Sequence, residues 1–362
     1  MAFYLLLILV CLLGYILIPS ERRATLLAFF LLTLVSALRA ETVGVDTPQF
    51  VGAFREISEG EIGQFLARYE VGFVLLCKGL SLVTESASSL IGVTSAFVNA
   101  SYLRFFVRHS KDLKMSTMLY IFANVFFMNM NVMRQAVATA ILLFGFSSLL
   151  SQSRHAKLKY AVSLFFATLF HIVSLASLFF FPVAMLLRKK WGALGISLGF
   201  LILYFTLDEA FYLFNRLLGN RYDGYLGGEF LSGNLFGSLL LFLLPFSVFV
   251  FLFALRTLFL RDGLFYAKEK NAALTAATLV FLLLSLLVTK MNIVERASNI
   301  FLPFLLLSLP MATDTFRASP RLYGYARFFV LTAYFSSFAV IMAYRPEWYG
   351  AIPYRPFFYQ IF

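Results

Sequence analysis

The sequence predicts an all-α polytopic membrane protein. Hydrophobic residues make up 61% of the 362 positions, charged residues only 13%, and the mean hydropathy is +0.85. Water-soluble globular chains of ordinary composition do not reach these values. Apolar stretches recur along the chain, and because lipid offers the backbone no hydrogen-bond partners, each is expected to be a helix. No linker or charge block sets off a soluble module, so we predict one integral-membrane domain over residues 1–362.

The first apolar stretch, residues 3–18, is predicted to be an uncleaved membrane helix. No basic region precedes it, and residues 21–23 (Glu-Arg-Arg) follow it. This charge order is the reverse of that in a secretory signal. The N-terminus is therefore expected outside the cytoplasm.

Basic clusters predict which loops face the cytoplasm. The positive-inside rule places six clusters there. They are Arg22/Arg23, Arg108/Lys111/Lys114, Arg154/Lys157/Lys159, Arg188/Lys189/Lys190, the segment from Arg256 to Lys270, and Arg317/Arg321/Arg327. The basic residues of these cytoplasmic loops account for much of the net charge of +12. The charge therefore does not indicate a nucleic-acid partner.

Parity between the clusters predicts about twelve crossings with both termini outside. The helices expected in the second part of the chain cover 115–128, 132–150, 191–207, 236–255, 272–289, 298–312 and 326–343. The outer side then carries the loops 39–68 and 208–235 and the tail 344–362.

Three apolar stretches, 24–38, 69–84 and 87–107, lie between the first two basic clusters. Parity requires that one of them does not cross the membrane fully. We choose 69–84, which carries Glu70 and Lys78, and predict a re-entrant or interfacial segment.

The segment around His171 is predicted to be a broken hairpin. Only 28 residues separate Lys159 from Arg188, too few for two spans of about 20 residues each. Irregular backbone at membrane depth is tolerated where protein buries it or where it lines a watery cavity. A site is expected at such a cavity.

Outer arginines form a candidate anion site. Nine of the ten basic residues expected outside are Arg, the cation that binds phosphate in bidentate fashion. The ten are Arg39, Arg55, Arg68, Arg134, Arg216, Arg221, Lys290, Arg296, Arg345 and Arg355. Arg134, His171 and Arg296 are expected at outward helix N-termini, which attract a pyrophosphate. The alternative is that Arg134 pairs with Glu295 or Asp46 to hold helices together.

Four residues are candidates for a general base: His171, Asp46, Glu70 and Glu295. His171 leads because the pKa of imidazole lies near neutral pH and because it alone of three histidines is expected in a span. A hydrogen-bonded packing role for His171 is the alternative.

The sequence indicates no metal ion and no organic cofactor. It contains no Asp-x-Asp, no His-x-x-x-His, no phosphate loop and no dinucleotide fingerprint. The close acidic pair Glu59 and Glu61 lies in a charged loop, and Cys11 and Cys77 lack a Cys-x-x-Cys spacing. We expect metal-independent chemistry that uses neither ATP nor NAD.

Several short motifs follow one another along the chain. They are Arg39, Asp46-Thr47, Glu70-Val71-Gly72-Phe73, Met133-Arg134-Gln135 with Ala138, Phe170-His171, Glu295-Arg296 and Ile352-Pro353-Tyr354. Together they resemble the EpsG-like branch of the Wzy polysaccharide polymerases. Two positions depart from that pattern, namely Phe50, where Tyr is usual, and Val173, where a small hydroxyl residue is frequent.

The resemblance implies a GT-C-like glycosyltransferase in the bacterial inner membrane with its active site facing the periplasm. It would move a growing glycan from undecaprenyl pyrophosphate onto another lipid-linked repeat unit, as in O-antigen polymerisation for lipopolysaccharide. A chain-length regulator protein is a candidate partner. The residues expected to bind substrate are Arg134, Arg296, Arg39, Gln135, Arg221, Glu70 and Tyr354.

Two other functions fit parts of the sequence. An O-antigen ligase uses the same donor but delivers the glycan to lipid A core. A flippase for lipid-linked oligosaccharides also needs a basic cavity, but such transporters are built from two related halves. No internal repeat is visible in the sequence.

Overall fold

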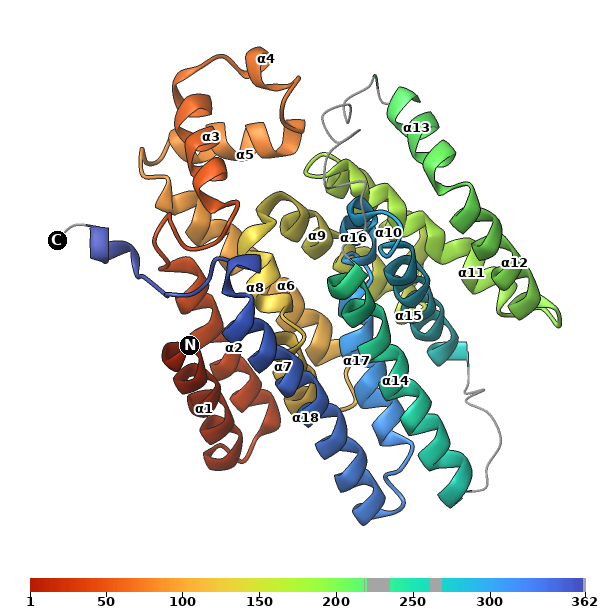
Figure 1. Ribbon diagram of the computed structural model, residues 1–362. Helices are drawn as coiled ribbons and strands as arrows, with labels where there is room; N and C mark the ends of the chain where they lie inside the picture. Colours follow the sequence, from red (N-terminus) through yellow and green to blue (C-terminus); the bar gives the residue numbers. More distant parts are fainter. Residues whose placement is uncertain (218, 220–234, 261–268, 361–362) are drawn as a thin grey trace. The chain divides into compact units, whose positions relative to one another are not determined.

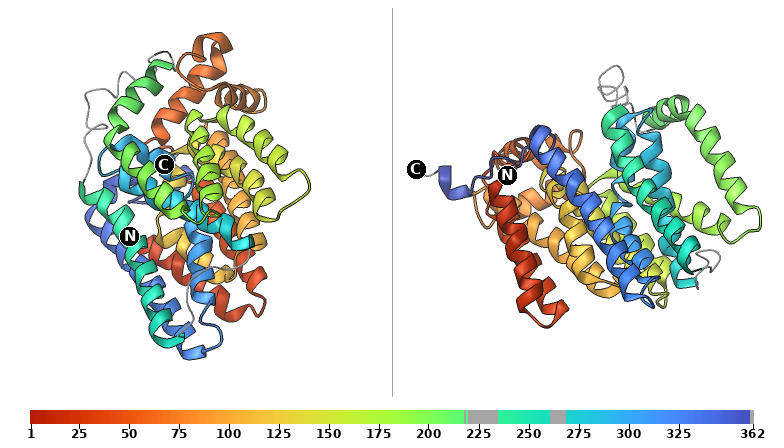
Figure 2. Two further views of the ribbon diagram at one scale, coloured as in Figure 1. Left: turned by 90° about the vertical axis from the view of Figure 1, so that its right-hand side faces the viewer. Right: turned by 60° about the horizontal axis from the view of Figure 1, so that its bottom comes forward.

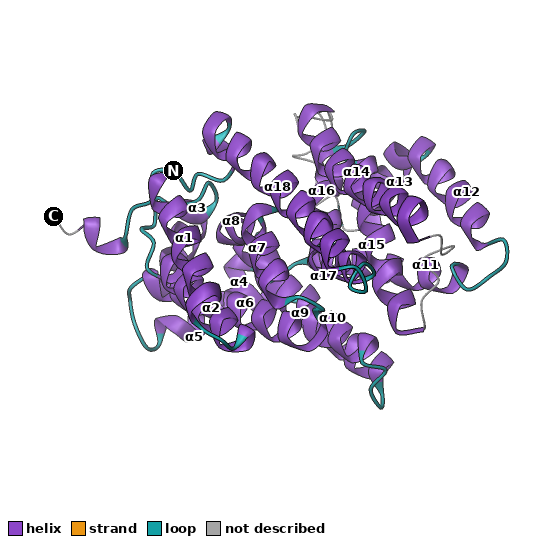
Figure 3. Cartoon of the chain, turned by 90° about the horizontal axis from the view of Figure 1, so that it is seen from below, coloured by secondary structure: helices purple, strands orange, loops and turns teal. Residues whose placement is uncertain are grey.

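The computed structural model describes residues 1–217, 219, 235–260 and 269–360. Within these residues the regular structure is helical, apart from one isolated bridge between Arg39 and Pro356 (Figures 1 and 3). The prediction of an all-α membrane protein is therefore confirmed.

The described helices include four that are long and apolar enough to cross a membrane, or up to six if each of two bent pairs is one span. The four are α6 (Ser88–His109), α9 (Met133–Leu150), α14 (Leu235–Leu260) and α18 (Pro320–Tyr344). Helix length explains why the sequence predicts more membrane-spanning helices than these. Several apolar stretches form helices of 10–17 residues, and at 1.5 Å per residue these are shorter than the roughly 30 Å of hydrocarbon.

The chain divides into two compact units, Met1–Leu175 with Thr313–Phe362, and Ala176–Ala312. The first unit also contains α1 (Ala2–Leu17), α2 (Glu21–Ala37), α3 (Thr47–Glu59), α4 (Ile62–Phe65), α5 (Val71–Ser81), α7 (Leu113–Phe122), α8 (Val125–Asn131), α10 (Ala156–Thr168) and the 3-10 helices Pro346–Trp348 and Phe357–Gln360. A further 3-10 helix, Ile172–Phe179, contains the division between the units.

The second unit holds α14 together with shorter helices. They are α11 (Phe180–Leu186), α12 (Gly192–Phe205), α13 (Leu207–Leu217), α15 (Glu269–Leu287), the 3-10 helix Asn292–Val294, α16 (Glu295–Ser298) and α17 (Leu302–Asp314), whose last two residues belong to the first unit. Residues 207–217 are helical, so the prediction of a loop starting at 208 is wrong there. Residues 220–234 of that loop lie outside the described part.

One end of the first unit gathers three of the basic clusters. The Lys114 amide donates to Glu21 Oε1 at 2.8 Å, which joins the start of α7 to the start of α2. Arg327 Nε lies 2.8 Å from Asp112 Oδ2, and α18 packs along α7 (Figure 2). The clusters near residues 22, 111 and 321 therefore share one end.

The opposite end brings the C-terminal tail against the first connecting segment. The Ala40 amide donates to the Arg355 carbonyl at 2.7 Å, and the Gly44 amide donates to the Gly350 carbonyl at 2.9 Å. Tyr4 Oη donates to the Ala351 carbonyl at 2.9 Å. Figure 1 shows the tail running across the ends of α1 and α2. The start of the chain and its tail thus lie at one end, as the predicted topology requires.

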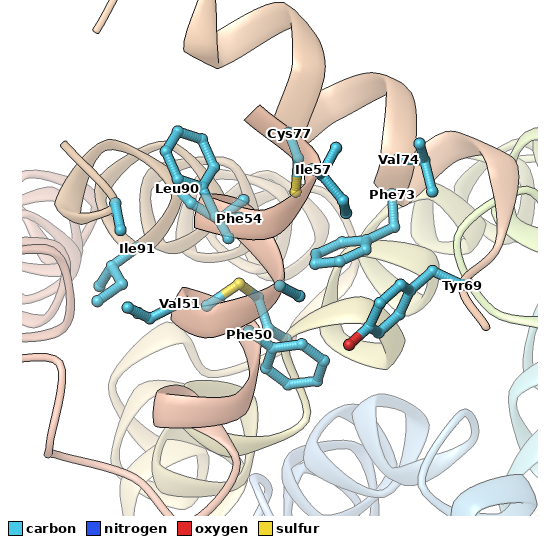
Figure 4. Packing of buried hydrophobic residues seen from close by; sticks show 13 residues of the cluster. Phe50, Val51, Phe54, Ile57, Tyr69, Phe73, Val74, Cys77, Leu90 and Ile91 are labelled. Atoms are coloured by element: carbon cyan, nitrogen blue, oxygen red, sulfur yellow. The ribbon is translucent and has the colours of Figure 1, made fainter. Parts of the chain in front are cut away.

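The segment predicted as the outer loop 39–68 is largely helical. In α3 the apolar side chains Phe50, Val51, Phe54 and Ile57 recur at helical spacing and are buried. They pack against α5 and the start of α6 in a separate hydrophobic cluster (Figure 4). The predicted external loop 39–68 therefore contains an amphipathic helix.

Helix α5 agrees with the prediction that 69–84 does not cross the membrane fully. Its 11 residues span roughly 17 Å. Lys78 Nζ reaches the end of α3 and donates to the carbonyls of Ser58 at 2.8 Å and Gly60 at 3.0 Å. A cation at a helix C-terminus satisfies carbonyls that have no helical partner, so Lys78 locks α5 onto α3.

Two helix breaks in the first unit bear on the predicted spans. The helix predicted over 115–128 is interrupted at Asn124, whose φ of 59° is left-handed, between α7 and α8. The break predicted near His171 is confirmed, because α10 ends at Thr168 and the next helical turn begins at Ile172.

The two ends of the first unit should be accessible from opposite sides of the membrane. In a chain whose native cysteines are replaced by alanine, a membrane-impermeant thiol reagent should label Gln64→Cys and Glu347→Cys in spheroplasts. Lys111→Cys and Ala318→Cys should react only after the membrane is opened. All four side chains are exposed. Labelling of Gln64→Cys and Lys111→Cys from the same side would contradict the assignment.

Candidate functional site

A buried carboxylate brings Arg134 and His171 together. Arg134 Nη1 donates to Glu70 Oε2, and His171 Nδ1 lies 3.5 Å from Glu70 Oε1. The side chains of Glu70 and His171 are each 8% exposed, and that of Arg134 is 20% exposed. Each carboxylate oxygen therefore serves a different partner. We call these three residues the Glu70 cluster.

Three helix ends meet at the Glu70 cluster. Glu70 is the N-cap of α5, Arg134 lies in the first turn of α9, and His171 follows the end of α10. The Gly72 amide donates to the Leu169 carbonyl at 2.7 Å. A Cβ on Gly72 would lie 2.7 Å from that oxygen, so only glycine allows this close approach.

Aromatic rings hold the Arg134 guanidinium in place. Its Cζ lies 5.6 Å from the centroid of the Phe50 ring, 5.3 Å from that of Tyr69 and 5.8 Å from that of Phe73. Cations are attracted to aromatic faces within about 6 Å. The rings belong to the hydrophobic cluster of Figure 4, so packing of α3 against α5 also fixes Arg134.

Electrostatics keep Glu70 ionised. Burial raises the pKa of Glu70, but the hydrogen bond to His171 and the charge of Arg134 outweigh burial and lower its pKa to about 2. A buried carboxylate is tolerated when it is paired in this way. At neutral pH Glu70 is therefore a fixed negative charge engaged with two partners, which favours His171 over Glu70 as the base.

Comparison with known families decides the assignment of the chain. The model of the EpsG family matches residues 22–355, which is nearly the whole chain and includes every residue of the Glu70 cluster. The chain belongs to the EpsG family. Searches of curated proteins and of solved structures found no match.

In this EpsG-family protein the ion pair expected at Arg134 is present, but its partner is Glu70 instead of Glu295 or Asp46. Asp46 is the N-cap of α3, one turn before Phe50, and its side chain is half-buried. Gln135 follows Arg134 on α9 and is buried.

Arg39 makes contacts of a structural kind. Its side chain is fully buried, and Nη1 donates to the Ser36 carbonyl and to Ser95 Oγ at 3.0 Å. Nη2 donates to the Met130 carbonyl at 2.9 Å. The guanidinium thereby joins α2, α6 and α8. This arrangement favours helix fastening over the substrate binding expected from the sequence.

Tyr354 also holds protein segments together. Its ring stacks on Phe3 with centroids 4.2 Å apart, and its hydroxyl donates to the Val35 carbonyl at 3.1 Å. These contacts fix the C-terminal tail on α1 and α2. They favour a structural role for the tail motif.

Of the remaining predicted site residues, two lie in the second unit and one lies outside the described residues. Glu295 and Arg296 form α16 in the second unit, before the 60° bend that leads into α17. Glu295 is exposed and Arg296 is half-buried. Arg221 lies outside the described residues.

Sequence analysis missed Tyr69, Phe73 and Lys78 as residues that shape the site. Phe73 stands in the quoted Glu70-Val71-Gly72-Phe73 motif and Lys78 was noted as a charge in 69–84, but neither was assigned a role. Tyr69 and Phe73 flank Glu70 within one helical turn, and Lys78 follows two turns later. Their contacts with Arg134 and with the end of α3 arise from tertiary packing.

Arg39→Lys should lower stability and leave turnover of the folded protein almost unchanged. Lysine keeps the charge but loses the planar fork that reaches three acceptors. A loss of roughly 2–3 kcal/mol is expected from acceptors left buried without a donor. Thermal unfolding in detergent measures it.

The matched control is Arg55→Lys, because Arg55 is exposed and pairs with Glu41 at the surface. A variant of Arg39 with normal thermal stability and lost activity would instead assign Arg39 to substrate binding.

Proposed function

We propose that this EpsG-family protein is a surface-polysaccharide polymerase of the O-antigen type. It moves a growing glycan from undecaprenyl pyrophosphate onto the terminal sugar hydroxyl of another lipid-linked repeat unit. The Glu70 cluster carries the proposal, because it places a cation suited to phosphate beside an imidazole suited to proton transfer. Membership of the EpsG family supports the reaction class.

Arg134 is the proposed ligand of the donor pyrophosphate. Its contact with Glu70 uses one N–H group, which leaves the other guanidinium donors for phosphate oxygens. Arg134 is partly exposed and is positioned by three rings. Pre-positioned charge of this kind stabilises negative charge that develops on a leaving group.

His171 is the proposed general base. Glu70 faces Nδ1, which favours the tautomer with the proton on Nδ1 and makes Nε2 the basic nitrogen of the ring. Nε2 takes the proton of the acceptor hydroxyl while that oxygen bonds to the anomeric carbon of the donor sugar. The bond from this carbon to the pyrophosphate oxygen breaks, and the pyrophosphate leaves with the electron pair. Glu70 acts as a positioning residue.

The proposed orientation puts the Glu70 cluster at the periplasmic face of the bacterial inner membrane. Basic residues gather at the other end of the first unit, and cytoplasmic loops carry such residues. About twelve crossings in a GT-C-like arrangement would follow if the shorter apolar helices also cross the membrane.

Arg134→Lys should reduce polymerisation roughly a hundredfold, since lysine keeps the charge but loses the fork. His171→Gln should also abolish most of the activity, because glutamine cannot take up a proton at neutral pH. The measurement is polymer length and rate with purified enzyme and lipid-linked repeat units. Arg68→Lys is the control, since Arg68 is exposed and pairs with Glu56.

Two results would contradict these roles. Normal polymerisation by Arg134→Lys would show that Arg134 only connects helices and does not bind the donor. A His171→Gln variant with near wild-type rate would exclude His171 as the base. Transfer to lipid A core in place of a second repeat unit would assign a ligase.

Activity should persist in EDTA, because the proposed displacement uses Arg134 and His171 in the roles that a metal ion fills in other transferases. Polymer formation with and without the chelator measures this. Loss of polymer that Mg²⁺ or Mn²⁺ restores would reject the metal-independent mechanism.

A further inference from the structure

Two buried hydrogen-bond donors belong to Arg134 of the Glu70 cluster and to Tyr69, whose ring contacts it. Tyr69 Oη and Arg134 Nε are both buried, and within the described residues neither has a hydrogen-bond partner. Tyr69 is 2% exposed. Buried polar atoms without partners cost free energy and are uncommon in native proteins. Two of them on residues in contact indicate an acceptor that the chain itself does not supply.

The geometry fixes both donors. The Tyr69 ring lies under the Arg134 guanidinium, with 5.3 Å between its centroid and Cζ, and it packs on Phe73 with centroids 5.5 Å apart. Figure 4 shows Tyr69 in the cluster that holds this ring. Burial raises the pKa of Tyr69, so the phenol keeps its proton and can donate it in a hydrogen bond.

We propose that Tyr69 Oη and Arg134 Nε donate to oxygens of one phosphate group of the lipid pyrophosphate, which makes Tyr69 a substrate-binding residue. A phosphate fits because it offers several acceptor oxygens and carries the charge that Arg134 attracts. A sugar hydroxyl carries no charge to match the cation. This inference rests on the proposed function and assigns a further residue to the same site.

Tyr69→Phe tests the inference because it removes the hydroxyl and keeps the ring. The probe is undecaprenyl pyrophosphate in detergent micelles, with undecaprenol as the ligand that lacks phosphate. Affinity for the pyrophosphate should fall about tenfold, roughly 1.4 kcal/mol, and undecaprenol binding should not change. Thermal stability without ligand should be equal to that of the wild type or higher, because an unpaired buried hydroxyl is removed.

Tyr334→Phe is the matched control. Tyr334 on α18 is also buried, and its hydroxyl has no partner among the described residues. This variant should show the same small effect on stability and unchanged affinity for the pyrophosphate.

The outcomes separate this inference from the proposed function. Unchanged affinity of Tyr69→Phe, together with weakened binding by Arg134→Lys, would overturn the role of Tyr69 alone. A Tyr69→Phe variant that is less stable or does not fold would also overturn it, because the hydroxyl would then bond within the protein. Equal binding of undecaprenyl pyrophosphate and undecaprenol by the wild type would overturn the proposed function as well.

Discussion

The buried charge of Glu70 is the constraint on which the candidate site depends. A carboxylate removed from water must be paired and hydrogen-bonded, and at this position the partners come from distant parts of the chain. Arg134 lies 64 positions further along, and His171 approaches from the end of α10. The same carboxylate thus joins α5, α9 and α10, and it explains why a guanidinium and an imidazole can lie together in largely apolar surroundings.

Local properties of the sequence predicted much of the fold. Hydropathy marked residues 3–18, which form α1, and charge parity required a break near His171, which the structure contains. The start of α9 at Met133 also agrees with the sequence. These features depend on short stretches of residues, where composition and length constrain the backbone directly.

The sequence did not predict which distant residues pair with one another. The sequence does not distinguish these acidic residues from one another, so nothing in it selected Glu70 as the partner of Arg134 over Asp46 or Glu295. Helix α3 was not predicted either, although its apolar residues recur at helical spacing in the sequence. The contacts of Arg39 could not be predicted either, because its acceptors are mostly backbone carbonyls. Every residue has a backbone carbonyl, so residue types do not show which ones Arg39 binds.

The contact between the C-terminal tail and the first connecting segment has a consequence for biogenesis. The amides of Ala40 and Gly44 find their acceptors only in the last residues of the chain. During synthesis this end of the first unit therefore stays open until α18 has been inserted and the tail has emerged. Such long-range closure is slow compared with local helix formation. Until then the amides of Ala40 and Gly44 lack these two acceptors.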